Sequence, residues 1–455
     1  MIFLFFHVLN LLFLSHAFLP KGLFPPPNIF YKRDHKIQLP TEERSALINN
    51  TKGFYGVVGP NKDFYKAKSL IELFSGDGVV QGVFIDSGNI TFVNHIIETA
   101  KVKFDRKYWR FPNNMFLLTI LSTLRLIPVS QGVANTALVH YADQTLALYE
   151  TDSPYLLDVD FNKKKVSTIQ KLNVPGINNF SGHTKKVGNL LETIDYDIFK
   201  REAIIYTLDK EMKIVQRIPV KTKYIPIVHD FIATEKYTIF IDSPLHIELD
   251  KILKKSMPVS LKRGKSTYIH VVNKHTNEIE TFELLDSIYA FHLTNFKETQ
   301  DKYMFESLQL DKLDFSDINF HPKLRKIVLN KNSKKVFNQK FENLEELDMD
   351  FPLKIDKTRT LFNLIGPNGF YGFAICKFTR IIKKIILDDT TIYGEPQIIQ
   401  WKGEPHVIAF IKDKESNSLF VMNLNDYTFT TTNIPLEITQ GFHSIFIPKQ
   451  SLIVS

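Results

Sequence analysis

The sequence predicts an all-β fold in one large unit, of the propeller, barrel or sandwich kind. Short runs rich in Ile, Val, Phe, Tyr and Thr recur along the chain, and Gly, Asn, Asp, Lys and Pro separate them. Such runs are typical of strands joined by polar turns, and many of them in one long chain favour these three architectures. From about Leu39 onward there is no low-complexity linker and no sharp change in composition, so we interpret residues 39–455 as one domain.

Five segments each predict two strands joined by a tight polar turn. They are residues 82–99, 137–151, 203–220, 237–249 and 406–434. The sequence shows no fixed repeat length, so periodicity does not give a number of blades. Residues 115–129 (MFLLTILSTLRLIPV) are the helical exception. Two interpretations of this segment stay open: a buried helix, or an element that dips into a membrane at the mouth of an apolar pocket.

The composition excludes several kinds of site. Hydrophobic residues make up 44% of the 455 residues, which is enough to bury a large core. The net charge of +8 is mild and spread along the chain, so we expect no nucleic-acid partner, although an anionic membrane surface is compatible. The single cysteine, Cys376, excludes an internal disulfide framework, a Cys-ligated zinc and an iron–sulfur cluster. Any metal must therefore be held by carboxylates and by some of the 14 histidines.

The N-terminus predicts a targeting signal. Residues 1–17 combine an apolar stretch with the small side chains Ser15 and Ala17, as in a secretory signal peptide, so we expect entry into the secretory route. Because a basic beginning is missing, an uncleaved anchor is the alternative. Residues 18–38 form a leader or a flexible segment, and the whole resembles the bipartite plastid-targeting leaders of algae with complex plastids. No later run of about 18 apolar residues exists, so we expect the body not to span a membrane.

Four histidines lie in unusual surroundings. His183 follows a Gly turn, whereas His229, His292 and His443 lie in apolar, strand-like runs. No two of them have the helical spacing of a local zinc motif. Taken singly, each is better explained as a core histidine than as a metal ligand. They meet only if each begins or ends an inner strand that points at a common axis, a geometry that a propeller provides.

Nine short motifs, in their order along the chain, resemble the carotenoid cleavage oxygenases. This family includes plant carotenoid dioxygenases, animal β-carotene oxygenases and the retinal-pigment-epithelium isomerohydrolase. The motifs with the four histidines are SGHTKKV (181–187), IVHDFIATEKYTIFIDSPL (227–245), FHLTNFKE (291–298) and GFHSIFIP (441–448). The others are FYGVVGPN (54–61), LFSGDGVVQGV (73–83), VANTALVHYADQTLALYETDSPYLLD (133–158), MDFPLKI (349–355) and GEPQII (394–399).

This resemblance implies a seven-bladed β-propeller with a mostly helical cap over the iron-bearing face. It also implies one Fe(II) per chain on the propeller axis, with O₂ as co-substrate. The implied ligands are His183, His229, His292 and His443. Four neutral imidazoles would leave the full charge of the ion in a low-dielectric interior, so nearby carboxylates are expected to offset it.

Three carboxylates fall where the family places acceptors for the histidine N–H groups: Glu150, Asp350 and Glu395. Asp350 replaces a Glu and is one methylene shorter, so we expect it to reach its histidine through water or through a small backbone shift. Thr136 matches the family threonine near the open iron position, and we predict a catalytic role for it. An ordinary strand hydroxyl is the alternative interpretation of Thr136.

The leading functional hypothesis is a non-haem Fe(II) dioxygenase that cleaves a conjugated double bond of a carotenoid or apocarotenoid into aldehyde or ketone products. The 38 Phe and 17 Tyr agree with an aromatic-rich tunnel. Because carotenoids dissolve in bilayers, we expect a peripheral membrane surface as partner, with residues 115–129 as the docking patch. Two alternatives stay open: an iron-dependent retinoid-type isomerase or hydrolase, and a polyene-binding propeller without chemistry.

Overall fold

A computed structural model describes most of the predicted domain. It covers residues 37–38, 51–61, 70–86, 89–108, 132–248, 259–315, 320–378, 380–401, 403–413, 416–434 and 437–449. The predicted signal peptide (1–17) and the predicted docking segment (115–129) lie outside these residues. Of the predicted leader, only its last two residues are described, and they pair with a strand of the first sheet.

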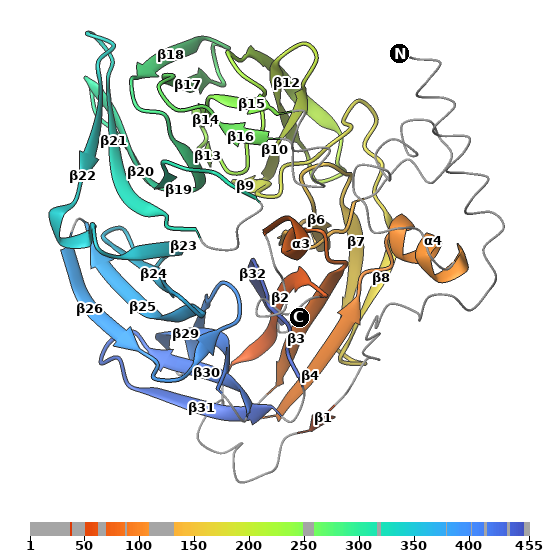
Figure 1. The fold of residues 1–455 in the computed structure, drawn as a ribbon. Coiled ribbons are helices and arrows are strands. Elements are labelled where there is room, and N and C mark those ends of the chain that lie inside the picture. Colours follow the sequence, from red (N-terminus) through yellow and green to blue (C-terminus); the bar gives the residue numbers. More distant parts are fainter. Residues whose placement is uncertain are drawn as a thin grey trace, which may run out of the picture.

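Seven antiparallel blades surround a central axis in the described part of the chain (Figure 1). The first blade contains β1 (Ile37–Gln38), β2 (Lys52–Pro60), β3 (Gly78–Asp86), β4 (Asn89–Ile96) and β32 (Ser444–Pro448). The second contains β5 (Ala137–Tyr141), β6 (Gln144–Leu148), β7 (Tyr155–Asp160) and β8 (Lys165–Lys171). The third contains β9 (Lys185–Val187), β10 (Leu190–Asp197), β11 (Glu202–Leu208) and β12 (Ile214–Lys221). The fourth contains β13 (Ile232–Ala233), β14 (Tyr237–Asp242), β17 (Thr267–Asn273) and β18 (Ile279–Leu284).

The remaining three blades follow in chain order. The fifth contains β19 (Tyr289–Glu298), β20 (Lys302–Leu310), β21 (Lys323–Asn330) and β22 (Val336–Lys340). The sixth contains β23 (Asp348–Lys354), β24 (Arg359–Gly366), β25 (Gly369–Lys377) and β26 (Arg380–Ile386). The seventh contains β28 (Gln397–Trp401), β29 (Glu404–Lys412), β30 (Asn417–Asn423) and β31 (Phe429–Ile434), and the short β27 (Thr391–Ile392) pairs with both β25 and β29, so it joins the sheets of the sixth and seventh blades. This arrangement confirms the predicted all-β, seven-bladed propeller.

The two ends of the chain close the ring. β32, near the C-terminus, pairs with β2 of the first blade, with Val57 opposite Ser444. β32 is therefore the innermost strand of a blade whose other strands come from the N-terminal part. The other blades begin with their innermost strand, so the innermost strands run in the same direction and start at the same end of the axis. Residues at the start of these strands are brought together however far apart they lie in the sequence.

Apolar side chains between neighbouring blades form the core. Every residue of β14 is buried, whereas β12, the outer strand of its blade, alternates between exposed and more buried positions. Ile239 of β14 packs with Phe282 and Phe305 in a cluster that joins the fourth and fifth blades. Each fully buried side chain of this size contributes roughly 1.5–3 kcal/mol. Apolar packing between the blades thus holds them together, so polar side chains can occupy the positions along the axis.

Four of the five predicted hairpin segments contain neighbouring antiparallel strands. The pairs are β3 with β4, β5 with β6, β11 with β12, and β29 with β30, to which β31 adds a third strand. The hairpin predicted at 237–249 is wrong. β14 pairs with β13 and β17, whereas β15 (Leu245–Ile247) pairs with β16 (Val259–Leu261). Pro244 has no N–H to donate, and the chain leaves the sheet there before it returns as β17.

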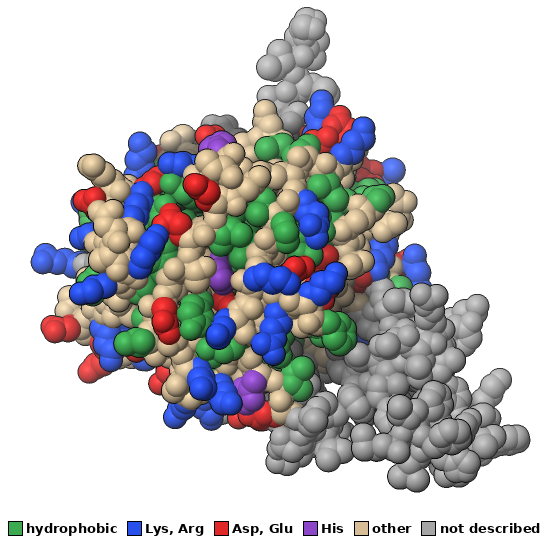
Figure 2. All heavy atoms as spheres, turned by 90° about the horizontal axis from the view of Figure 1, so that it is seen from above, with side chains coloured by type: hydrophobic (Ala, Val, Ile, Leu, Met, Phe, Trp, Pro, Cys, Tyr) green, Lys and Arg blue, Asp and Glu red, His purple; other side chains and the backbone are tan. Residues whose placement is uncertain are grey.

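Short elements cover the end of the axis where the innermost strands begin. The described helices are α3 (Leu70–Phe74), α4 (Ala100–Tyr108) and the 3₁₀ helix η2 (Glu342–Leu344). Leu70 of α3 and the β15–β16 hairpin share an apolar cluster with Phe291, so both belong to this cover. Among the described helices, none is long and apolar enough to cross a membrane. On the face shown in Figure 2, basic, acidic and apolar side chains are interspersed.

Candidate metal centre

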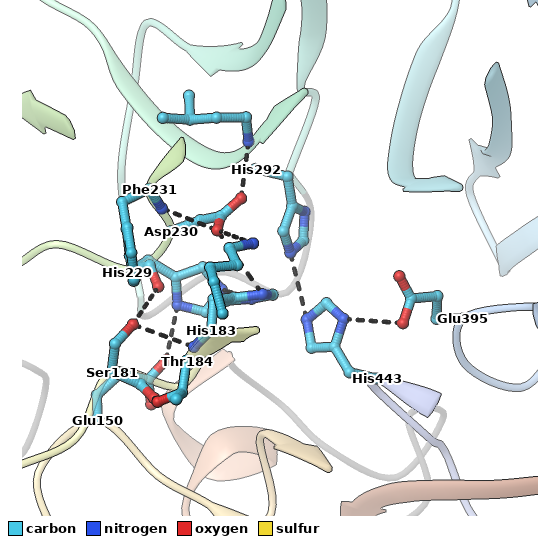
Figure 3. A network of polar contacts seen from close by, with 12 residues as sticks. Glu150, Ser181, His183, Thr184, His229, Asp230, Phe231, His292, Glu395 and His443 are labelled. Atoms are coloured by element: carbon cyan, nitrogen blue, oxygen red, sulfur yellow. Dashed lines mark hydrogen bonds and ion pairs between the residues drawn. The ribbon is translucent and has the colours of Figure 1, made fainter. Parts of the chain in front are cut away.

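The four histidines singled out in the sequence lie together on the axis. One ring nitrogen from each of His183, His229, His292 and His443 lies within 4.8 Å of the others. The Nε2 atoms of His183 and His229 are 3.2 Å apart, and those of His292 and His443 are 3.3 Å apart (Figure 3). Each ring lies near the start of the innermost strand of a different blade: His183, His229 and His443 come just before β9, β13 and β32, and His292 lies in the first half of β19. That these nitrogens bind a metal stays a prediction.

The protein interior keeps some of these rings neutral. Burial, followed by the three other rings and Lys185, lowers the pKa of His183 well below its usual value. Burial also lowers the pKa of His443, although Glu395 opposes the effect. For His292 burial would lower the pKa, but the carboxylate of Asp350, together with the charges of Asp230 and Glu395, raises it above its usual value. Because a metal ligand must be a neutral imidazole, the lowered values of His183 and His443 suit coordination.

Three of the four rings have their outer nitrogen against a carboxylate, and these are the three carboxylates that the family resemblance implied. His229 Nδ1 lies 2.7 Å from Glu150 Oε1, and His443 Nδ1 lies 3.3 Å from Glu395 Oε2. His292 Nδ1 contacts Asp350 Oδ1. An Nδ1–H that donates to a carboxylate leaves the Nε2 lone pair directed at the centre of the group. The three contacts therefore favour the tautomer with the proton on Nδ1, which is the tautomer that a ligand binding through Nε2 requires.

The carboxylates come from the three blades that supply no histidine. Glu150 follows β6 of the second blade, and Asp350 lies in β23 of the sixth blade. Glu395 lies between β27 and β28, and β28 is the innermost strand of the seventh blade. All seven blades thus contribute to the centre, each at the same end of the axis.

Asp350 reaches its histidine directly, so the predicted water bridge is not what the structure contains. The register of β23 against β24 shifts between Asp350 and Leu353, as in a β-bulge. Phe351 lies in this bulge with a φ of 52°, which is uncommon for a bulky residue. The Phe351 N–H donates to Asp350 Oδ1 at 2.9 Å, which fixes the carboxylate. A bulge of this kind redirects the side chain, so the direct contact fits the predicted backbone adjustment.

Thr136 lies beside the centre, at the start of β5. Its hydroxyl donates to Glu150 Oε2 at 3.1 Å. A Cβ atom on Gly182 would lie 2.7 Å from both Glu150 Oε1 and Thr136 Cγ2, so only glycine fits next to His183 at this point. Burial would raise the pKa of Glu150, but the hydrogen bond and charge of His229 hold it below its usual value. Thr136 therefore contacts the acceptor of a histidine, and its catalytic role stays a prediction.

Sequence reasoning missed Asp230, whose side chain lies beside the centre. Asp230 Oδ1 is 2.6 Å from Lys185 Nζ and 3.9 Å from His183 Nδ1. Only 5% of Asp230 is exposed. The available signal was a carboxylate directly after His229 within an apolar run, in the motif IVHDF.

Aromatic rings surround the centre. Phe291 meets the ring of His229 edge to face, with centroids 5.1 Å apart, and Phe351 meets His443 in the same way at 5.0 Å. Next to His443, Phe442 packs against Phe74 of α3 at 5.5 Å. These side chains give the histidine group an apolar environment, and Phe291 and Phe74 also belong to the cluster that covers this end of the axis.

The donor set fits a divalent transition metal. Neutral imidazole nitrogens suit Fe, Zn, Cu and Ni, so the ligands by themselves do not select iron. Three carboxylates that accept the outer N–H groups orient the rings and make them better donors.

Comparison with known proteins places the chain in a family. Residues 49–448 match the family model described as "Retinal pigment epithelial membrane protein". The "Carotenoid 9,10(9',10')-cleavage dioxygenase 1" of Arabidopsis thaliana is 24% identical over 461 residues, which cover 87% of this chain and 84% of the relative. The protein of that name from Pisum sativum is 25% identical over 462 residues, with the same coverage.

Solved structures show the same fold. The Pseudomonas brassicacearum lignostilbene dioxygenase has a TM-score of 0.73 at 17% identity, covering 94% of this chain and 97% of its own. A cobalt-substituted Synechocystis apocarotenoid oxygenase has a TM-score of 0.74 at 16% identity, covering 92% and 97%. Together with the family match over residues 49–448, these findings show that the chain belongs to the carotenoid cleavage oxygenase family.

Proposed function

We propose that the protein is an iron-dependent dioxygenase that cleaves one conjugated double bond of a carotenoid or apocarotenoid. The observation that carries this proposal is the group of four inward-facing imidazoles on the axis, three of them backed by carboxylates. When bound, a ferrous ion supplies the activation of O₂, whose two atoms enter the two carbonyl products. The polyene supplies the electrons, so no external reductant is needed.

The residues of the chain have three tasks in this reaction. The imidazoles would hold the ion, and Glu150, Asp350 and Glu395 would keep the rings in the required tautomer. We expect the ring of Phe291, on the covered side, to keep water away and to offer apolar surface to a polyene, whereas Phe351 packs in the core of the sixth and seventh blades beside His443. A rigid substrate held at a fixed depth presents one double bond to the centre, so we expect positioning to decide which bond is cleaved.

Two other functions remain as outcomes of the test. An isomerase or hydrolase acting on a retinoid-type ester would use the same ion as a Lewis acid and would consume no O₂. A polyene-binding propeller without chemistry would bind substrate and release no product. The complete set of four histidines and three carboxylates favours an active centre, because binding a polyene alone needs none of these groups.

The deciding experiment produces the chain in bacteria that accumulate different carotenoids and identifies the products by mass. We expect two carbonyl fragments per substrate, each with one oxygen from ¹⁸O₂, and stoichiometric O₂ uptake. His292→Ala should lose bound iron and all product, whereas His270→Ala, which removes an equally buried histidine from β17, should keep both. Turnover without O₂ uptake would refute cleavage in favour of isomerisation or hydrolysis.

We also propose a membrane-facing location for this activity. Polyenes dissolve in bilayers, and residues 115–129 are the candidate docking patch. The N-terminal 17 residues are the candidate signal for the secretory route, with a plastid as the candidate destination. Deletion of residues 1–17 should release the protein from tight membrane attachment, and continued insertion would refute the signal-peptide interpretation.

A further inference from the structure

His183 differs from the other three histidines on the axis. The outer nitrogens of His229 and His443 lie 2.7 and 3.3 Å from a carboxylate oxygen, within hydrogen-bond distance. His183 Nδ1 lies 3.9 Å from Asp230 Oδ1, beyond a direct hydrogen bond. Asp230 is nevertheless buried against this ring and has other partners. Its role beside the centre is therefore not that of Glu150, Asp350 and Glu395, which we call the three axial carboxylates because they lie around the propeller axis.

The partners of Asp230 come from the strands that carry three of the histidines. Oδ1 accepts from Lys185 Nζ at 2.6 Å, and Lys185 follows His183 by two residues. Oδ2 accepts from the backbone N–H of Leu293 at 2.9 Å, and Leu293 directly follows His292. Asp230 itself directly follows His229. Figure 3 shows the carboxylate between these strands, with the Phe231 N–H as a further donor at 2.8 Å.

We propose that Asp230 and Lys185 form a positioning pair that fixes the spacing of the strands bearing His183, His229 and His292. This inference rests on the proposed metal-dependent function. Each partner of the carboxylate lies within two residues of a different histidine, so the pair ties three blades together at the height of the rings. Bonds at such short range set the distances between ring nitrogens more tightly than apolar packing further from the axis.

Lys185 has a second task in this pair. The three axial carboxylates already outweigh the charge of a divalent ion, and an unpaired Asp230 would add another negative charge in a buried place. The ammonium group cancels that charge. The ammonium nitrogen lies 2.6 Å from Asp230 Oδ1, and the backbone N–H groups of Leu293 and Phe231 donate to the same carboxylate. The pair thus joins the strands without changing the charge of the centre.

The test measures metal binding instead of turnover. The full-length apoprotein is titrated with Co²⁺ in competition with a chromophoric chelator, and the visible spectrum of bound Co²⁺ reports ligand geometry. We expect Asp230→Asn to weaken Co²⁺ binding by about 10–100-fold and Lys185→Met by roughly 10-fold, with altered spectra. Lys185→Arg keeps the charge and the donor, so it should restore binding to within a few-fold of wild type.

Matched controls come from an ion pair away from the axis. Arg325 of β21 makes two contacts with Glu345, and neither residue adjoins a histidine of the centre. Glu345→Gln and Arg325→Met should leave Co²⁺ affinity and spectrum unchanged even where they lower the melting temperature. Equal loss of affinity in these controls would overturn the inference, because the effect would then be one of general stability.

The remaining outcomes separate this inference from the proposed function. Wild-type Co²⁺ binding together with unchanged binding and spectra in Asp230→Asn and Lys185→Met overturns the positioning pair alone. A wild-type chain that fails to bind Co²⁺ at the four histidines overturns the proposed function as well. If Asp230→Asn fails to fold, the comparison of Lys185→Met with Lys185→Arg decides, because Lys185 is 32% exposed and both variants change only that side chain.

Discussion

Buried carboxylates occur in two regions of this propeller, and the two regions balance the charge differently. On the axis, each of the three carboxylates faces a histidine of the metal centre. Between the third and fourth blades, Glu192 of β10 meets Lys274 Nζ at 2.5 Å and the Thr238 hydroxyl at 2.5 Å. The pair between the blades contains its own cation. The axial groups have imidazoles as partners, which suits a site that takes up a positive ion.

The pKa values of the carboxylates in the two regions are shifted in opposite directions. Burial raises the pKa of Glu192 above its usual value despite Lys274, whereas His229 holds the pKa of Glu150 below it. Glu192 thus contributes to how blades dock, and Glu150 contributes to how a ring is oriented. The comparison predicts that variants between blades change stability without changing metal affinity, and that axial variants do the reverse.

The largest expected effect comes from breaking the pair between the blades. Lys274→Met leaves the Glu192 carboxylate buried without a cation, which should lower the free energy of unfolding by about 3–5 kcal/mol in urea denaturation. Lys334→Met removes an exposed partner of Glu280 and should cost less than about 1 kcal/mol. Co²⁺ affinity of folded Lys274→Met should equal that of wild type. A large loss of affinity would erase the distinction between the two regions.

An axial variant should show the opposite pattern. Asp350→Asn keeps the shape of the side chain but removes the charge that makes His292 a better donor, so metal affinity should fall by about 10–100-fold, or roughly 1.4–2.8 kcal/mol. The same strand offers a control. Asp348 lies away from the axis, and its Oδ2 accepts a hydrogen bond from His321 Nδ1 at 2.6 Å. Asp348→Asn should leave Co²⁺ affinity unchanged. Equal affinities for wild type and Asp350→Asn would contradict an orienting role for this carboxylate.

The local parts of the fold were predictable from the sequence, and the non-local parts were not. Residues 137–151 gave a hairpin because alternating residues flank a turn at Ala142 and Asp143, both at positive φ. The hairpin prediction at residues 237–249 was wrong because β14 pairs with β17, which begins more than twenty residues later in the chain. No local pattern specifies a partner at that distance. The number of blades came only from the resemblance to a family.

The site shows the same limit. His183, His229, His292 and His443 come from four strands, and their spacing contains no information about convergence. Asp230 was visible only as a charge in an apolar run, and its partners Lys185 and Leu293 become neighbours only when three blades assemble. The direct contact of the shorter Asp350 depends on a bulge that composition does not reveal.

The smallest expected effect concerns a buried carboxylate with an amide partner. Glu306 of β20 is 7% exposed and accepts from Asn295 Nδ2 at 2.7 Å. Burial raises its pKa, so the folded state disfavours ionisation, and stability present at acidic pH is lost as the pH rises through the folded pKa. Glu306→Gln cannot ionise and therefore avoids this loss of stability, so at neutral pH the variant should be more stable than wild type, by less than about 1.5 kcal/mol.

The measurement is urea denaturation of both proteins from about pH 4 to about pH 8. The stability difference between Glu306→Gln and wild type should grow with pH, because only the wild type must bury a charge or keep a proton at neutral pH. Glu280→Gln, at an exposed position paired with Lys334, should give no such stabilisation. A difference that stays constant across the pH range would mean that Glu306 titrates alike in the folded and unfolded states. Glu306 would then belong with neither group of carboxylates, because its charge would be balanced by more distant lysines such as Lys326, without a direct ion pair, an imidazole or a retained proton.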